Sequence, residues 1–183
     1  MIQLPIDSYI NEITSKILEP HPVILTASPG SGKTTRVPIA LLKEFVKKNI
    51  NKKIIVLVPK RVAAVSAASR VCEENNISLG ESVGYAVRFE NNSKPTTQLI
   101  YMTEGTFIKK LSDEKFYQSV GCIFFDEFHE RRSSTDLLIG LSLERKILQN
   151  DLQIVVMSAT LDVHLLHKFL GNKTQHIDID SPP

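Results

Sequence analysis

The sequence has little cysteine, no long hydrophobic run and no large excess of charge. Its only cysteines are Cys72 and Cys122, in a chain of 183 residues. So few thiols predict reduced, packed side chains and a cytoplasmic protein rather than a disulfide-stabilised one. We expect no membrane segment and no signal peptide, because apolar runs are short and the first residues are acidic where a signal peptide is basic.

The composition excludes further classes. Hydrophobic residues make up 42% of the chain and charged residues 23%, which is typical of a soluble globular protein and not of a disordered one. The formal net charge is only +2, so a site for an acidic polymer would have to be a local patch. No internal repeat or low-complexity segment interrupts the chain. One domain of ordinary size is expected.

Strand-like runs alternate with helical segments. The runs are continuously apolar, which is typical of strands buried on both faces of a parallel sheet. The expected strands are 23–27, 53–58, 98–102, 121–126 and 153–158. The expected helices are 8–18, 32–48, 60–75, 104–111, 135–148 and 162–170, the last beginning at Asp162 as its N-cap. This order predicts a doubly wound α/β sheet that binds ligands at the carboxyl ends of its strands.

The segment between the first strand and the next helix is ASPGSGKTT, residues 27–35. It departs from the phosphate-loop pattern G-x-x-x-x-G-K-[ST] only at Ala27. At a junction of this kind, backbone N–H groups converge on a β-phosphate, and Gly30 and Gly32 let the backbone come close to it. The alternative is a glycine-rich turn that does no more than cap the helix.

The helix after this loop begins with Lys33 and Thr34. Lys33 would reach the β- and γ-phosphates, and Thr34 would offer its hydroxyl to Mg²⁺. Pro38, in the second turn, is expected to kink the helix or cost it a hydrogen bond. The predicted nucleotide-binding residues of the loop are Pro29, Gly30, Ser31, Gly32, Lys33, Thr34 and Thr35.

A pair of carboxylates follows another apolar run, in GCIFFDEFHERR (121–132). At the carboxyl end of its strand, Asp126 could hold Mg²⁺ through water, and Glu127 could orient and deprotonate an attacking water. Adjacent strand residues point in opposite directions, which would divide the two tasks between them. Capping of the next helix is the alternative for this pair.

Three other polar residues are ambiguous by themselves. His129 follows the carboxylates, and a lone histidine is more often a structural, hydrogen-bonded residue than a catalytic one. Ser158 and Thr160 end another apolar run, VVMSAT (155–160), where plain helix capping is the simpler interpretation.

Five short motifs occur in the order of motifs I, Ia, Ib, II and III of superfamily 2 helicases, which the chain resembles from about residue 4 to its end. They are ASPGSGKTT (27–35), PKRVAA (59–64), TEG (103–105), DEFH (126–129) and SAT (158–160). Two further segments are similar to the DEAH-type branch, VGYAVRFE (83–90) and HERRSSTD (129–136). The details that resemble bacterial HrpB-like helicases are DEFH in place of DEAH, GKTTRVP (32–38) and LPID (4–7).

The resemblance resolves the question of the loop, because that branch accepts alanine at the position of Ala27. It implies a RecA-like domain that binds ATP or another NTP with Mg²⁺. It also implies that His129, Ser158 and Thr160 couple the nucleotide state to domain closure. Arg70 aligns with an arginine that stacks on the nucleotide base, a contact suited to a planar guanidinium.

The resemblance further implies a bound nucleic-acid strand. Lys60, Arg61 and Thr103 would contact its sugar-phosphate backbone, and Arg88 is a further strand or structural contact. Lys60 replaces the arginine that is more usual in the family. A lysine ammonium would then contact the phosphate as a point charge, whereas an arginine guanidinium can donate two parallel hydrogen bonds. The alternative for these basic residues is a solvated helix face or loop.

The motifs beyond motif III are missing from the sequence. A helicase of this kind needs a second RecA-like domain with motifs IV to VI, whose arginines complete the ATP site. The end of the chain, DIDSPP, has the pattern of a strand that runs into a linker. We therefore expect residues 1–183 to be the first RecA-like domain, a monomer that binds Mg-nucleotide and hydrolyses it slowly or not at all without its second domain.

The chain is predicted to be the ATP-binding domain of a DExH/DEAH-type helicase that acts on nucleic acid. RNA is the favoured substrate. Two alternatives from other classes stay open at this point. One is a non-catalytic module that changes shape on binding nucleotide, although an intact Glu127 argues against it. The other is a small P-loop kinase, which gives no reason for SAT or TEG.

Overall fold

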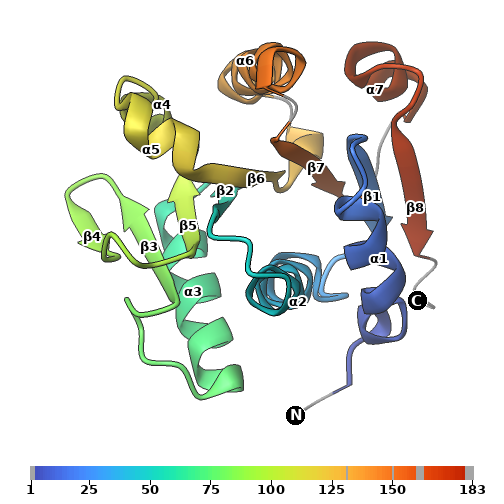
Figure 1. Cartoon of the computed structure of the whole chain (residues 1–183). Helices are drawn as coiled ribbons and strands as arrows, with labels where there is room; N and C mark the ends of the chain where they lie inside the picture. Colours follow the sequence, from blue (N-terminus) through green and yellow to red (C-terminus); the bar gives the residue numbers. More distant parts are fainter. Residues whose placement is uncertain (1–2, 131, 150, 160–162, 180–183) are drawn as a thin grey trace.

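The computed structural model describes residues 3–130, 132–149, 151–159 and 163–179. Within these residues, eight strands form one sheet in the order β4-β3-β5-β2-β6-β7-β1-β8 (Figure 1). The paired strands are parallel except β3 and β4, which form an antiparallel hairpin. The strands are β1 Val23–Ala27, β2 Lys53–Val58, β3 Val83–Val87, β4 Glu90–Asn92, β5 Leu99–Thr103, β6 Val120–Phe125, β7 Gln153–Ser158 and β8 Gln175–Ile179.

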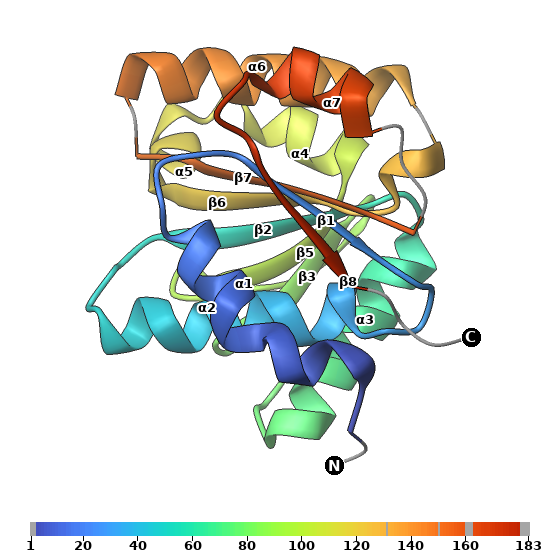
Figure 2. The same ribbon diagram turned by 90° about the vertical axis from the view of Figure 1, so that its right-hand side faces the viewer.

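Helices cover both faces of this sheet (Figure 2). One layer consists of α1 Ile10–Ile17, α2 Lys33–Lys47 and α3 Arg61–Asn75. The opposite layer consists of α4 Glu104–Lys110, α5 Glu114–Ser119, α6 Ser133–Gln149 and α7 Val163–Leu170. Two short 3₁₀ helices, η1 Pro5–Tyr9 and η2 Phe128–Glu130, precede α1 and follow β6.

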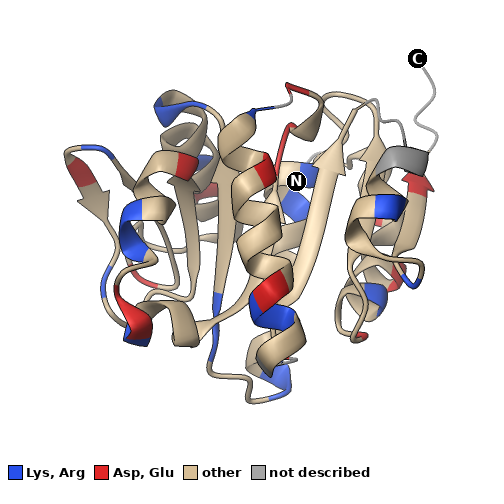
Figure 3. Ribbon diagram, turned by 90° about the horizontal axis from the view of Figure 1, so that it is seen from above, with Lys and Arg blue, Asp and Glu red and all other residues tan. Residues whose placement is uncertain are grey.

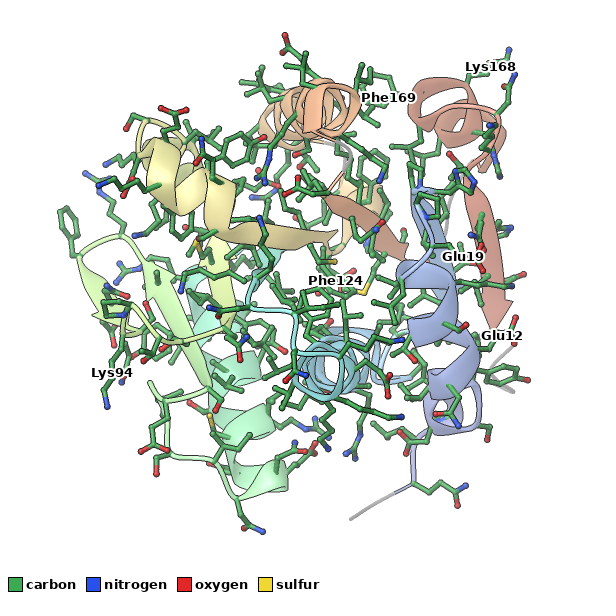
Figure 4. All side chains as sticks on the ribbon, in the orientation of Figure 1. Glu12, Glu19, Lys94, Phe124, Lys168 and Phe169 are labelled. Carbon is green, nitrogen blue, oxygen red and sulfur yellow. The ribbon has the colours of Figure 1, made fainter. Side chains whose placement is uncertain are left out.

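The strands are buried on both faces because alternate side chains enter two hydrophobic cores. In β2, Ile54 and Val56 join the core under α1, α2 and α3, whereas Ile55 and Leu57 join the core under α4 to α7. Figure 4 shows Phe124 of β6 in the interior, and it belongs to the first of these cores. Two-sided burial of this kind is what the continuously apolar runs predicted.

The predicted α/β fold is confirmed. β1, β2 and β7 have the predicted bounds, and β5 and β6 are each displaced by one residue. The predictions omitted β3, β4 and α5, because β3 includes Gly84 and β4 is a short polar edge strand. The predicted N-cap Asp162 lies outside the described residues.

The spacing of Leu137, Leu141 and Leu148 in the sequence predicts an apolar stripe along α6, but the buried face of this helix is a different one. The stripe residues are exposed: Leu137, Leu141 and Leu148. Leu138 and Ile139 face the sheet instead, together with Arg145 and Lys146. The charged ends of these two side chains donate to main-chain carbonyls, Arg145 Nη2 to Val120 O at 2.9 Å and Lys146 Nζ to Leu152 O at 2.7 Å. Their polar groups are satisfied, so their stems can be buried where hydrophobic periodicity does not predict burial.

Candidate functional site

The glycine-rich loop connects β1 to α2 at the carboxyl edge of the sheet. Gly30 and Gly32 have φ angles of 76° and 103°, in the left-handed region that favours glycine. A Cβ on Gly32 would also lie 2.9 Å from Leu4 Cδ1 and 3.0 Å from Ile6 Cγ2, because the N-terminal segment packs against the loop. The loop therefore keeps its shape through glycine and through this contact.

Lys33 is held at the base of the loop. Its side chain is buried, and its Nζ donates to the carbonyl oxygens of Ala27 at 2.5 Å and Ser28 at 2.9 Å. Burial lowers the pKa of the Lys33 ammonium, whereas the neighbouring charges of Asp126 and Glu127 raise it. Phosphate oxygens could replace the two carbonyls as acceptors with little movement of the side chain.

The loop and the carboxylate pair are joined by one hydrogen bond. Thr34 Oγ1 donates to Asp126 Oδ2 at 2.6 Å, and the backbone N–H of Glu127 donates to Asp126 Oδ1 at 3.0 Å. The Asp126 N–H donates to Leu57 O at 3.0 Å, which fixes the end of β6 against β2. Burial raises the pKa of Asp126 to about 6, while the Thr34 hydrogen bond acts to lower it.

The division of the two carboxylates does not arise from strand alternation. β6 ends at Phe125, so Asp126 and Glu127 both lie beyond the strand. Glu127 has a φ angle of 53°, a left-handed conformation that is uncommon for a residue with a side chain. This turn leaves Asp126 buried and directs Glu127 to the cavity beside the loop.

That cavity has a volume of about 210 Å³. Its lining consists of Leu4, Pro29, Gly30, Gly32, Lys33, Thr34, Thr35, Arg70 and Glu127. All the predicted nucleotide-binding residues line this cavity except Ser31, which is buried. Arg70 lies at the rim, where its Nε donates to Glu74 Oε1 at 3.0 Å.

His129 lies between the carboxylate pair and β7. Its Nδ1 is 3.3 Å from Ser158 Oγ and 3.3 Å from Glu127 Oε2. Ser158, the last residue of β7, is fully buried. The structure therefore brings together two of the three predicted coupling residues, and the third, Thr160, lies outside the described residues.

A second hollow occupies the carboxyl ends of β2, β3 and β5. Lys and Arg are interspersed with Asp and Glu over the ribbon (Figure 3), so a basic site has to come from local grouping. This hollow has a volume of about 560 Å³ and is called the strand groove below. Its lining consists of Pro59, Arg61, Val87, Arg88, Phe89, Thr103, Gly105, Thr106 and Lys109.

Three of the four predicted strand contacts line this groove: Arg61, Arg88 and Thr103. The fourth, Lys60, is adjacent in sequence, but its ammonium is 3.9 Å from Glu130 Oε1. It is exposed, and its place is beside the groove rather than in its lining.

Three residues at these sites were not predicted from the sequence: Phe89, Lys109 and Tyr101. Phe89 and Arg88 form the two-residue loop of the β3–β4 hairpin, where Phe89 is 88% exposed and the Arg88 guanidinium lies 4.6 Å from its ring centroid. The pairing of an arginine with a phenylalanine is visible in VGYAVRFE, but the exposure of the ring is not. Tyr101 gave no such signal, because its hydroxyl bonds to Thr34 O across 67 residues of sequence.

Among the described residues, no helix combines the length and the apolar character that crossing a membrane requires. In the same residues, no three His, Cys, Asp or Glu side chains gather as a metal cage.

A mostly parallel sheet with a phosphate loop after β1 and a carboxylate pair after β6 defines a RecA-like P-loop domain. The family model of DEAD/DEAH box helicases matches residues 8–169, so the chain belongs to the DEAD/DEAH box helicase family.

Two curated relatives are similar over almost the whole chain. A probable ATP-dependent RNA helicase DHR2 from Saccharomyces cerevisiae is 38% identical over 173 residues, which are 92% of this chain and 23% of the relative. A probable ATP-dependent RNA helicase DHX35 homolog from Caenorhabditis elegans is 38% identical over 183 residues, 98% of this chain and 25% of the relative. The chain thus spans about a quarter of the length of these relatives.

Proposed function

We propose that this chain is the first RecA-like domain of an ATP-dependent, HrpB-like DEAH helicase that acts on RNA. The observation that carries the proposal is the 2.6 Å hydrogen bond from Thr34 Oγ1 to Asp126 Oδ2. It joins the phosphate loop to the carboxylate pair at one edge of the sheet. Family membership supports the ATPase, and the similarity to two probable RNA helicases supports RNA as the strand.

The proposed reaction is in-line attack of water on the γ-phosphate. Glu127 orients the water and accepts its proton, while Lys33 and the N-terminus of α2 stabilise negative charge on the phosphate oxygens. Pro29, Gly30, Ser31, Gly32 and Thr35 complete the loop around the phosphates. Arg70, at the rim of the cavity, stacks on the base once its contact with Glu74 is exchanged.

The residues at the site fit Mg²⁺. A threonine hydroxyl and a buried carboxylate oxygen 2.6 Å apart are hard oxygen donors of the kind this ion binds, directly or through water. Burial raises the pKa of Asp126, and a bound cation would favour its ionised form. Thr34 and Asp126 would hold the ion, which when bound neutralises charge on the β- and γ-phosphates.

Nucleotide state reaches the rest of the protein through His129, Ser158 and Thr160 in this proposal. His129 is the central member because its Nδ1 is within 3.3 Å of both Glu127 and Ser158. A change at Glu127 on hydrolysis would alter that contact and, through β7, the orientation of a second RecA-like domain.

The strand groove holds a single strand of RNA in the same proposal. Arg61, Arg88 and Lys60 contact phosphates, and Thr103 contacts the sugar-phosphate backbone. Phe89 offers an exposed ring on which a base can stack. Contacts of this kind depend on charge and stacking and not on base sequence.

Hydrolysis at the normal rate requires the second RecA-like domain, because an arginine from that domain is worth on the order of 10³ or more in rate. The isolated chain is expected to be a monomer that binds Mg-ADP through Lys33 and turns over slowly or not at all. Mg-ATP hydrolysis with and without single-stranded RNA tests this expectation. Robust RNA-stimulated turnover by the chain alone would contradict it.

The Glu127→Gln variant separates catalysis from simple binding. We expect it to keep Mg-ADP affinity and, when a second RecA-like domain is supplied, to lose turnover by about 100-fold or more, because the water loses its base. A non-catalytic module predicts equal turnover for the variant and the parent. Absence of any Lys33-dependent ADP binding would overturn the proposed function as a whole.

A further inference from the structure

The second turn of α2 lacks one main-chain donor. In a regular helix the N–H of residue 38 would bond to the carbonyl of residue 34, but residue 38 is Pro38. The carbonyl that loses this donor belongs to Thr34, the same residue whose hydroxyl donates to Asp126. Pro38 is buried, so bulk water is a poor substitute.

A side chain from the sheet takes the place of that donor. The Tyr101 hydroxyl, from β5, donates to Thr34 O at 2.8 Å. Tyr101 is fully buried. Its burial, with nearby Asp126 and Cys72, raises the pKa of the Tyr101 phenol well above its usual range. The hydroxyl is the donor in this contact, because a carbonyl oxygen can only accept.

Thr34 is consequently held at both ends. Tyr101 fixes its carbonyl, and Asp126 accepts from its hydroxyl and from the Glu127 amide. We propose that Tyr101 is a positioning residue for the Mg-nucleotide site, and that Pro38 frees the Thr34 carbonyl for this contact. The inference rests on the proposed function, because it assigns Tyr101 to the same site.

The Tyr101 hydroxyl and a backbone N–H of residue 38 would connect the Thr34 carbonyl to different parts of the protein. A backbone N–H would tie the Thr34 carbonyl only to its own helix. The Tyr101 hydroxyl ties it to β5, two residues before Thr103 in the strand groove. The direction of the Thr34 hydroxyl is then set by the sheet, which also carries Asp126.

The Tyr101→Phe variant removes this donor and no carbon atom. We expect Mg-ADP to bind about tenfold more weakly, the equivalent of one buried hydrogen bond of ~1.4 kcal/mol. ADP binding in EDTA should change by less than about twofold, because Thr34 acts through Mg²⁺. A general loss of structure would weaken both. Tyr117→Phe is the matched control, since the Tyr117 hydroxyl contacts Leu141 O on the opposite face of the sheet.

Pro38→Ala supplies the missing N–H and tests the pairing. In the Pro38→Ala background, Tyr101→Phe should weaken Mg-ADP by less than about twofold, because the Thr34 carbonyl regains a donor in its own helix. A tenfold loss in both backgrounds would overturn the proposed pairing. So would a Tyr101→Phe variant that binds Mg-ADP as tightly as the parent.

A readout without nucleotide separates this inference from the proposed function. In the nucleotide-free chain, Tyr101→Phe should speed hydrogen exchange of the amides in the first two turns of α2 by about tenfold, and Pro38→Ala should reverse the effect. Unchanged exchange in Tyr101→Phe would sink the inference whatever the nucleotide data. Failure of the parent chain to bind ADP, with exchange as expected, would count against the proposed function alone.

Discussion

At the β1, β6 and β7 end of the carboxyl edge, Lys33 and Asp126 are buried and hydrogen-bonded to neighbouring groups, whereas at the β2, β3 and β5 end the basic side chains are exposed. Lys33 and Asp126 are 5% and 6% exposed, and each is held by main-chain or side-chain partners. Arg61, Arg88 and Lys109 extend into solvent. The order of the strands puts these two regions side by side, with β2 and β6 at the boundary.

Under the proposed function, this difference corresponds to two kinds of recognition. A buried, bonded network is rigid before its ligand arrives and suits a small ligand of fixed shape, such as a phosphate chain with a metal ion. Exposed cations retain their freedom and suit a long polyanion whose contacts are numerous and individually weak. Tyr101 connects the two regions. It lies in β5, on the side of the sheet with the strand groove, and its hydroxyl donates to Thr34 O at the candidate nucleotide site.

The largest effect is expected for Lys33→Ala, which should separate nucleotide binding from RNA binding. We expect Mg-ADP affinity to fall about 100-fold, because charge-assisted hydrogen bonds to phosphate contribute up to ~3 kcal/mol. The affinity for labelled single-stranded RNA should change little, since Lys33 is buried away from the groove. Titrations of both ligands on one preparation measure this, and an equal loss for RNA would mean that the two regions are one site.

Salt should act on the groove more than on the nucleotide site. With three phosphate contacts and a slope of about −0.7 per contact, RNA affinity should fall about 20-fold between about 50 and about 200 mM salt. Mg-ADP affinity should fall much less, because its partners are buried and poorly screened. Fluorescence anisotropy over this range of salt gives both slopes. Equal salt slopes for RNA and Mg-ADP would mean that exposed and buried charges do not separate the two sites.

Acid should act on the nucleotide site and leave the groove unaffected. The pKa of Asp126 is raised to about 6, and Mg²⁺ binds only its ionised form, so the proton competes with the ion below that pH. We expect Mg-ADP affinity to fall about tenfold from pH 7 to pH 5 and to be constant above pH 7. A parallel titration without Mg²⁺ corrects for protonation of ADP itself. An unchanged affinity at pH 5 would exclude Asp126 as the metal partner.

The smallest effect on RNA affinity is expected for single substitutions of Phe89 and Arg88 in the strand groove. Phe89→Ala should weaken RNA about fivefold with an unchanged salt slope, because stacking involves no charge. Arg88→Ala should weaken RNA by a similar factor and reduce the slope by about 0.7, since one phosphate contact is lost. Identical salt slopes for the two variants would argue against this assignment.

Much of the fold could be predicted because its signals are local. Continuous apolar runs and helical periodicity predicted β1, β2, β7 and the α-helices other than α5, with bounds that the structure repeats within two residues. α6 is the instructive failure. Its stripe is exposed, because Arg145 and Lys146 can be buried once their charges meet carbonyls that β6 and the turn before β7 bring near.

The candidate site divides in the same way. The loop, Lys33 and Thr34 are contiguous, and Asp126 and Glu127 follow a recognisable strand, so their place at one sheet edge could be predicted from sequence. The left-handed turn at Glu127 and the exposed ring of Phe89 could not, because both depend on how neighbouring strands end. The roles of these residues remain proposals.

The RecA-like α/β domain of the DEAD/DEAH box helicase family, its phosphate loop and its carboxylate pair could all be predicted from the order of residues along the chain. The burial of Asp126, the grouping of basic residues that follow β2, β3 and β5 in one groove, and the hydrogen bond from Tyr101 to Thr34 O depend on tertiary structure. The reason is physical. Periodicity and turn chemistry act over a few residues, whereas burial and hydrogen bonding join residues far apart in the chain once the sheet has formed.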